Sequence, residues 1–206
     1  MVETAPALPL VFFPGAAGKK QYLEPIGHCL ASRRPPTFCE YPGLDGAPAN
    51  PQLRTLADLQ RYLLRSLPPR FDLVTMSMGG VLALRIALEA PERVRKLVLM
   101  ATSGGVDVQA FGGIDWRDTF RRLQPDLPTW FLHEREDLTP ELGRIHHPTL
   151  LIYGDEDLIA PVAAGEHLCA HLPNARLEVI AGGTHDLEIE HPAFIASQIE
   201  AHLRRP

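Results

Sequence analysis

The sequence predicts an α/β protein with a mostly or wholly parallel sheet of about six strands. Short runs of leucine and β-branched residues alternate with longer segments of helical periodicity, which is typical of strands joined by crossover helices. The strand runs are almost continuously apolar, as expected when helices cover both faces of a sheet. We expect strands at residues 8–13, 37–41, 71–75, 96–101, 149–153 and 176–180.

The helices are predicted from the spacing of apolar residues between these runs. Apolar side chains four residues apart predict a first helix over residues 22–30, and leucines three or four apart predict a second over 53–67. A third is expected from about 78 to 90, immediately after the third strand. Two further helices are expected after Pro161 and Pro192, because proline is favoured in the first helical turn.

The segment 104–138 differs from the rest because it is rich in large apolar residues but contains no clear strand. We expect it to form a small helical cap, inserted into a single domain that spans residues 1–206. A chain of 206 residues exceeds the commonest domain size but falls short of two ordinary domains. The alternative is a mobile loop whose aromatic residues belong to the ordinary core.

The charge and the segment pattern disfavour several kinds of partner. The net charge is −5 and the basic residues are scattered, so neither nucleic acid nor an anionic membrane surface is expected as partner. No apolar stretch approaches the length of a membrane span, and the N-terminus lacks the basic region of a signal peptide. We expect a small-molecule substrate, and no pattern bears on the oligomeric state.

The cysteines and histidines give no sign of a disulfide framework or a bound cofactor. Cys29, Cys39 and Cys169 form an odd, widely spaced set, which favours a reducing cytoplasm. His146 and His147 are adjacent and cannot easily converge on one ion, so no metal is expected. The glycines near the N-terminus lack the spacings of nucleotide-binding loops, and no cofactor is expected.

One strand run ends in a pattern that indicates chemistry. Residues 71–80 read FDLVTMSMGG, in which an apolar strand stops at Ser77 and a helix begins at once. This is the outline of a nucleophile elbow, a strained turn that exposes a serine and needs small neighbours two residues away. Gly79 meets that need, whereas Thr75 stands where glycine is expected. Taken alone, such a serine is more often a helix N-cap.

Two other strand ends offer partners for this serine. A serine hydroxyl is inert near neutral pH unless a general base takes its proton and a third group orients that base. The run ending at Gly154 is followed by Asp155, Glu156 and Asp157, and His185 lies in a glycine-rich loop after the last strand. The ordinary alternatives are solvated loop charges and a surface histidine.

Together these motifs resemble the α/β-hydrolase family, whose serine, acid and histidine follow in that order on loops at the carboxyl ends of strands. The resemblance covers nearly the whole chain and implies a three-layer α/β-hydrolase fold. It rests on Phe13-Pro14-Gly15-Ala16, Ser77-Met78-Gly79, Pro91-Glu92-Arg93-Val94, Pro148-Thr149-Leu150 through Asp157, and Gly183-Thr184-His185.

The resemblance assigns a role to each polar residue of the motifs. It implies that Ser77 is the nucleophile, that His185 is the general base and then acid, and that Asp157 is the orienting carboxylate. Asp155 is the rival acid. Asp186 adjoins the base, but we expect it to point away and to be structural.

The resemblance also implies an oxyanion hole formed by the backbone N–H groups of Ala16 and Met78. The family usually has His-Gly where this chain has Pro14-Gly15, a change expected to affect loop rigidity more than chemistry. Only seven residues precede Leu8, so we expect the family's first antiparallel hairpin to be missing and the sheet to be wholly parallel.

The function implied is that of a serine hydrolase, a carboxylesterase or thioesterase that cleaves its substrate through an acyl-enzyme. One alternative is a non-catalytic hydrolase-like binding protein, in which Thr75 and the shortened sheet edge result from a loss of activity. Another is lyase or cofactor-free peroxidase chemistry on the same scaffold. Several apolar residues are candidates for substrate binding, although a core role is equally expected for most. They are Tyr22, Met76, Trp116, Phe120, Trp130 and Phe131.

Overall fold

A computed structural model describes residues 8–30 and 35–205 and contains one six-stranded sheet within them. Every neighbouring pair of strands is parallel, and the order is β2-β1-β3-β4-β5-β6. This confirms the prediction of a wholly parallel sheet. The strands are β1 (Leu10–Phe13), β2 (Pro36–Phe38), β3 (Phe71–Met76), β4 (Val94–Met100), β5 (Thr149–Gly154) and β6 (Ala175–Ile180).

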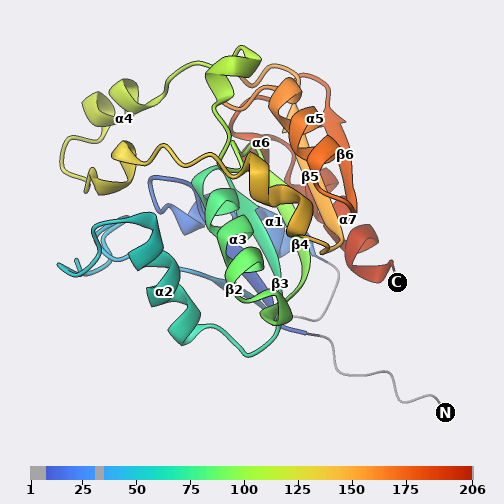
Figure 1. Ribbon diagram of the computed structural model, residues 1–206, viewed down its shortest axis with the longest axis horizontal. Coiled ribbons are helices and arrows are strands. Elements are labelled where there is room, and N and C mark those ends of the chain that lie inside the picture. The colour runs from blue at the N-terminus through green and yellow to red at the C-terminus, as the bar shows by residue number, and fades with distance from the viewer. Residues whose placement is uncertain (1–7, 31–34, 206) are drawn as a thin grey trace.

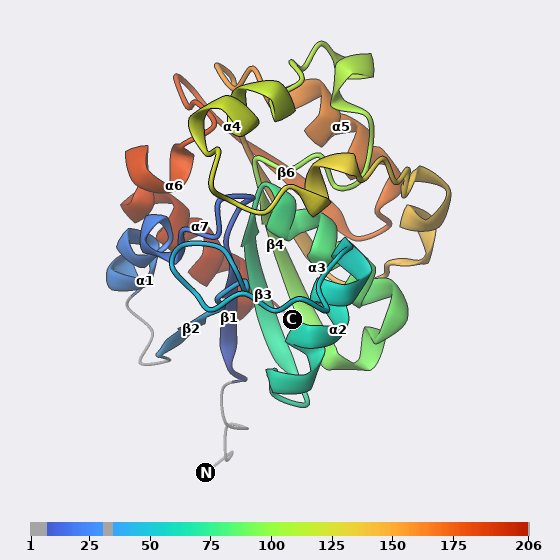
Figure 2. The ribbon, with the colours of Figure 1, turned by 90° about the vertical axis from the view of Figure 1, so that its left-hand side faces the viewer.

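Helices cover both faces of the sheet and give the three layers that were predicted (Figures 1 and 2). One face carries α2 (Leu56–Ser66), α3 (Met78–Glu89) and α5 (Val162–His171). The other carries α1 (Glu24–Cys29), α6 (Leu187–Glu190) and α7 (Pro192–Arg204). Successive strand residues point to opposite faces, so Val11 packs under the first group of helices and Phe12 under the second.

Two expected boundaries were wrong because an apolar residue near the end of an element was taken to belong to it. β2 ends at Phe38, not at Tyr41. Tyr41 is buried because its ring packs in the core and its hydroxyl donates to the Pro14 carbonyl (2.9 Å). The helix expected over residues 22–30 is shorter, since Tyr22 ends a separate 3₁₀ turn (Lys20–Tyr22) and lies 37% exposed.

The other differences at strand ends are small and have local causes. β1 begins at Leu10, two residues later than expected, and β4 begins at Val94, two residues earlier. β4 ends at Met100 and not at Ala101, because the backbone of Ala101 turns to φ 44°. Such a left-handed conformation cannot continue a strand.

The segment between β4 and β5 contains only helical turns and loops in its described residues. It lies over the carboxyl ends of the strands, with α4 in the upper part of Figure 2. That residues 104–138 form a cap inserted into a single domain stays a prediction. The helical pieces are η3 (Val108–Phe111), α4 (Arg117–Leu123), η4 (Trp130–His133) and η5 (Thr139–Arg144), and η2 (Pro91–Arg93) precedes β4. No helix among the described residues could cross a membrane.

Charged groups anchor the C-terminal helix at the amino ends of the central strands, opposite the edge that carries the polar loops. The Asp72 carboxylate is fully buried and accepts two hydrogen bonds from Arg95 (2.7 and 2.5 Å). Next to it, the Lys96 ammonium donates to the carbonyls of His202 (3.1 Å) and Arg205 near the end of α7. The His202 ring lies 3.2 Å from the Pro148 carbonyl.

This anchor predicts acid sensitivity. Burial, and next the positive charge of Lys96, lower the pKa of His202 to about 4, whereas an unfolded histidine has a pKa of about 6.5. In this pH range His202 is protonated in the unfolded chain but not in the folded chain. The free energy of unfolding therefore decreases as the pH falls from about 6.5 toward 4. In urea titrations, His202→Gln is expected to weaken the pH dependence of the midpoint in this range. An unchanged dependence would contradict this explanation.

Candidate active site

Ser77 occupies a strained turn between β3 and α3. Its φ of 51° and ψ of −119° are unusual for a residue with a side chain and cost about 1–3 kcal/mol. Three hydrogen bonds hold this conformation: the Ser77 N–H donates to the Met100 carbonyl (2.9 Å), and the Ser77 carbonyl accepts from Gly80 N–H (2.9 Å) and Thr102 Oγ1 (2.6 Å). The turn therefore projects one serine side chain above the carboxyl edge of the sheet.

Thr75, the departure from the expected elbow motif, is accommodated in the sheet. It is fully buried, and its hydroxyl donates to the Val98 carbonyl (3.2 Å). The elbow instead packs closely against neighbouring backbone at Gly79, where a Cβ atom would lie 2.7 Å from the Phe13 carbonyl oxygen and 2.8 Å from that of Pro14. Glycine is thus required on the helical side of the turn, while the upstream position tolerates threonine.

The loops after β5 and β6 are pressed together at two glycines. A Cβ atom on Gly154 would lie 2.0 Å from the Gly183 carbonyl oxygen, so only glycine permits this approach. The Gly183 carbonyl accepts from Glu156 N–H (3.0 Å), and the Asp155 carboxylate accepts from Gly182 N–H (2.6 Å). Asp155, the rival acid of the sequence analysis, therefore ties the two loops together.

The same loops bring three polar side chains into one hydrogen-bonded series. His185 Nδ1 lies 2.8 Å from Asp157 Oδ2, and His185 Nε2 lies 3.2 Å from Ser77 Oγ. The Asp157 carboxylate is buried, and its Oδ1 accepts from Ile159 N–H (2.8 Å) and Ala160 N–H (2.9 Å). With Nδ1–H donating to this carboxylate, Nε2 is left to accept the serine proton.

The histidine loop has a second support that the sequence analysis missed. Glu190 accepts hydrogen bonds from the N–H (3.0 Å) and hydroxyl (2.8 Å) of Thr184, and these bonds lower the pKa of its carboxyl. Asp186 begins α6, where its carbonyl accepts from the N–H groups of Ile189 (2.9 Å) and Glu190 (3.1 Å). The acids after His185 were the available signal, but their partners depend on how the loop folds back.

Ala16 and Met78 flank Ser77 from the two sides of the turn. Ala16 follows β1, and Met78 is the first residue of α3. Gly15 lies close to the elbow, since a Cβ atom there would be 3.4 Å from the Cβ of Ser77. Among the described residues, neither the Ala16 N–H nor the Met78 N–H donates to a main-chain carbonyl. Both groups are therefore free to donate to a ligand.

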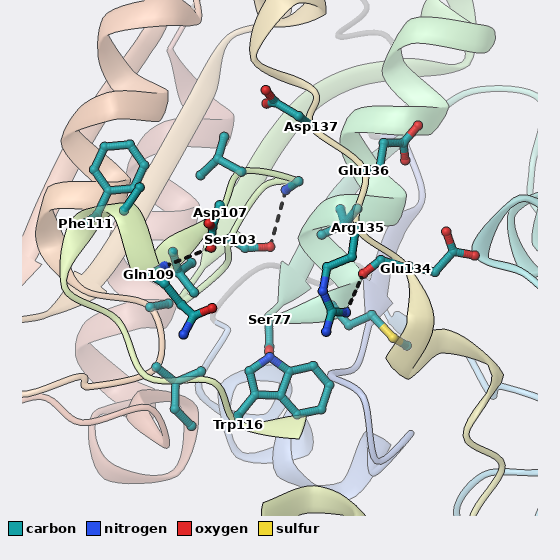
Figure 3. A pocket seen from close by; sticks show the side chains of 18 of the residues that line it. Ser77, Ser103, Asp107, Gln109, Phe111, Trp116, Glu134, Arg135, Glu136 and Asp137 are labelled. Carbon is teal, nitrogen blue, oxygen red and sulfur yellow. Dashed lines mark hydrogen bonds between the residues drawn. The ribbon is translucent and has the colours of Figure 1, made fainter. Parts of the chain in front are cut away.

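Two cavities meet at Ser77. The larger, of about 480 Å³, extends under the segment between β4 and β5, and Figure 3 shows Trp116, Gln109 and Arg135 around it. The smaller, of about 300 Å³, extends past the loop after β1. Ser77, Trp116, Ile159 and His185 border both cavities. A ligand that contacts Ser77 would thus have space on either side of it.

The candidate pocket residues are distributed unequally between these cavities. Tyr22, Met76 and Phe120 border the smaller cavity, and Phe131 borders the larger. Trp130 borders neither of the two and packs edge-on against Phe131, with ring centroids 5.2 Å apart. The sequence patterns did not reveal the polar residues that line these cavities, because these residues follow no period. They include Gln109, Arg117, Glu134 and Arg135 in the larger cavity and Glu188, on α6, in the smaller one.

The residues that the structure describes contain no group of three or more His, Cys, Asp or Glu side chains that could hold a metal ion.

A family model described as the alpha/beta hydrolase fold matches residues 9–141 and 121–192 of the chain. The chain belongs to the alpha/beta hydrolase fold family. This confirms the resemblance found in the sequence.

Relatives with assigned activities share about a third or less of their residues with this hydrolase-fold chain. It is 28% identical over 202 residues to a pimeloyl-[acyl-carrier protein] methyl ester esterase of Nitrosomonas europaea, which covers 76% of this chain and 80% of that protein. It is 32% identical over 178 residues to a 2-hydroxymuconate semialdehyde hydrolase of Pseudomonas putida, with 64% and 62% covered.

Solved structures show the same fold at lower identity. A thermophilic esterase from Thermogutta terrifontis superposes with a TM-score of 0.77 at 19% identity, over 98% of this chain and 91% of that one. A hydrolase from Pseudomonas aeruginosa gives a TM-score of 0.78 at 21% identity, with 98% and 92% covered. These likenesses establish the arrangement of strands and helices.

The contact between the two loops predicts that Gly154→Ala damages the protein. The added methyl group meets backbone atoms that cannot move away, and overpacking of this kind costs typically 1–3 kcal/mol. We expect a lower midpoint in urea denaturation. Gly143→Ala is the matched control, because a Cβ atom there meets nothing within 4 Å. Equal stability of the two variants would show that the loops do not depend on this approach.

Proposed function

We propose that the protein is a serine hydrolase that cleaves a carboxylic ester or thioester through an acyl-enzyme. The observation that carries this proposal is the hydrogen-bonded series from buried Asp157 through His185 to Ser77, which ends on a strained turn between two cavities. A serine becomes nucleophilic when a base of fixed tautomer accepts its proton. The hydrolases among the relatives support the same class of reaction.

The reaction begins with attack of Ser77 Oγ on the acyl carbon while His185 Nε2 takes the hydroxyl proton. The developing oxyanion accepts hydrogen bonds from the N–H groups of Ala16 and Met78, each of which contributes roughly 3–4 kcal/mol in comparable enzymes. His185 then protonates the departing alcohol or thiol, and the acyl group stays on Ser77. Asp157 stabilises the imidazolium throughout.

Hydrolysis of the acyl-enzyme repeats these steps with water as the nucleophile. His185 Nε2 accepts a proton from the attacking water, and the oxygen of that water bonds to the acyl carbon. Collapse of the second tetrahedral intermediate releases the carboxylic acid and returns the proton from His185 to Ser77 Oγ. No cofactor is needed for this cycle.

The geometry favours this proposal over a non-catalytic binding protein. Loss of activity would be indicated by a serine side chain turned away from the histidine, whereas Ser77 Oγ lies 3.2 Å from His185 Nε2. Thr75 is no sign of decay either, because its hydroxyl is paired within the sheet. Lyase or peroxidase chemistry on the scaffold is distinguished by assaying small esters against the substrates of those reactions.

A fluorophosphonate probe is expected to label Ser77 and no other serine. Ser77→Ala should abolish both labelling and ester hydrolysis, because among the described residues Ser77 carries the only hydroxyl that is hydrogen-bonded to His185. Ser197→Ala is the matched control, since that hydroxyl donates to the Phe194 carbonyl on α7, on the surface. Peptide mass spectrometry locates the label. Folded protein that stays unlabelled while a known serine hydrolase is labelled in parallel contradicts the proposal.

The two candidate acids are separated by matched amide substitutions. Asp157→Asn should lower kcat on the order of 10⁴-fold, because an amide no longer holds the histidine in the reactive tautomer. Asp155→Asn keeps an oxygen that can accept from Gly182 N–H, so its loss should be far smaller. Steady-state kinetics on one p-nitrophenyl ester compare the two variants. A larger loss in the Asp155 variant would reverse the assignment.

A further inference from the structure

Glu188 is a buried acid beside the site, and it has no role in the proposed reaction. It lies on α6, three residues after His185, is only 2% exposed and borders the smaller cavity. Its Oε2 atom is buried and has no hydrogen-bond partner among the described residues. Buried polar atoms are nearly always paired, because an unpaired one costs free energy. The unpaired oxygen therefore points to a partner that comes from outside the chain.

The neighbouring acid on the same helical turn shows the difference. Glu190 is exposed, and both of its oxygens accept hydrogen bonds from Thr184. That acid has a clear structural task in the histidine loop. Glu188 is buried instead, and its Oε2 atom has no hydrogen-bond partner among the described residues.

The protonation of Glu188 is finely balanced. Burial raises the pKa of its carboxyl to about 7, and the nearby charges of Asp186 and Glu190 act in the same direction. Its own backbone N–H and the charge of His185 act against that rise. Near neutral pH the group can thus donate a hydrogen bond as an acid or accept one as a carboxylate.

The walls around Glu188 indicate the chemistry of the missing partner. Leu23, Met76 and Phe120 line the same cavity, whereas Lys19, which also borders it, donates to the Tyr22 hydroxyl (3.1 Å). Thr119, Gln124 and Asp186 also border the cavity, but a ligand ammonium would still lose much of its hydration against the apolar part of its walls. A hydroxyl is neutral and both donates and accepts, so it can pair with either protonation state of the carboxyl.

We propose that Glu188 is a specificity-determining residue whose carboxyl hydrogen-bonds to an aliphatic hydroxyl on the part of the substrate that occupies the smaller cavity. The inference rests on the proposed hydrolase function, because this cavity shares Ser77 and His185 with the reacting bond. The preferred substrate class is accordingly a hydroxyl-bearing ester or thioester.

The test compares pairs of esters in which a hydroxyl replaces a methyl group of equal size. One pair places the change on the acyl side: methyl heptanoate, and its analogue with a terminal hydroxyl in place of the last methyl. The other places it on the alcohol side: propyl acetate and ethylene glycol monoacetate. The quantity measured is the ratio of kcat/KM for the hydroxyl ester to that for the methyl ester.

This ratio is measured for wild type, Glu188→Met and the control Glu92→Gln, an exposed acid at the amino end of β4. For one of the two pairs, the wild-type ratio should exceed that of Glu188→Met by about two- to tenfold, the effect of one typical hydrogen bond. Glu92→Gln should keep the wild-type ratio. Glu188→Met should unfold at the same temperature as wild type or higher, because methionine fills the site without an unpaired oxygen.

Equal ratios in wild type and Glu188→Met for both pairs, with hydrolysis intact, overturn the role of Glu188 and leave the hydrolase standing. A lower unfolding temperature of Glu188→Met also overturns it, because the carboxyl would then have a partner inside the protein, such as a buried water. A wild-type protein that hydrolyses none of the four esters and takes up no fluorophosphonate refutes the proposed function itself.

Discussion

The contact between the loops after β5 and β6 is the constraint on which the site depends. These strands are parallel neighbours, so their carboxyl ends lie side by side and their loops leave the sheet together. Only the absence of a side chain at Gly154 allows the backbone at Gly183 to come as close as it does. Asp157 and His185 follow within three residues on either loop, and this approach brings them to hydrogen-bonding distance.

Ser77, the third side chain of the series, is positioned differently, by the strained turn between β3 and α3. A backbone conformation that costs free energy is held by hydrogen bonds from the end of β4, the segment just after it and the first turn of α3, and Ser77 is presented above the sheet as a result. Strain of this kind persists only where the surroundings over-determine it. In this chain the surroundings are Met100, Gly80 and Thr102, all next to the central strands. Stability of the central sheet is therefore linked to the placement of the serine.

Much of the fold followed from sequence patterns, because strands buried on both faces are continuously apolar and the loops after them are polar. The order of serine, acid and histidine located Ser77, Asp157 and His185 through a family resemblance, and the structure brings these three side chains together. Tyr41 was misjudged, since a buried side chain does not require a strand. Trp130 was a candidate for the pocket, but it borders neither of the two cavities and packs against Phe131.

The residues that the patterns did not reveal act through tertiary contacts. Glu190 and Glu188 are two residues apart on a short helix, and only the folded loop determines that one is paired at the surface while the other faces a cavity. Likewise, Thr75 is a departure from the elbow motif in the sequence, and only the structure shows that its hydroxyl donates to the Val98 carbonyl. Motifs thus indicate where chemistry occurs, whereas the specificity of a site depends on side chains that no motif contains.

The acyl-enzyme mechanism is tested most directly by observing the acyl group on Ser77 during turnover. The protein is mixed with a p-nitrophenyl ester, quenched in acid within the first turnovers, digested and analysed by mass spectrometry. An acyl-enzyme mechanism predicts that the peptide containing Ser77 carries the mass of one acyl group and that no other peptide does. Continued ester hydrolysis with the acyl group on another residue, or with none while nitrophenol appears in a pre-steady-state burst, would contradict it.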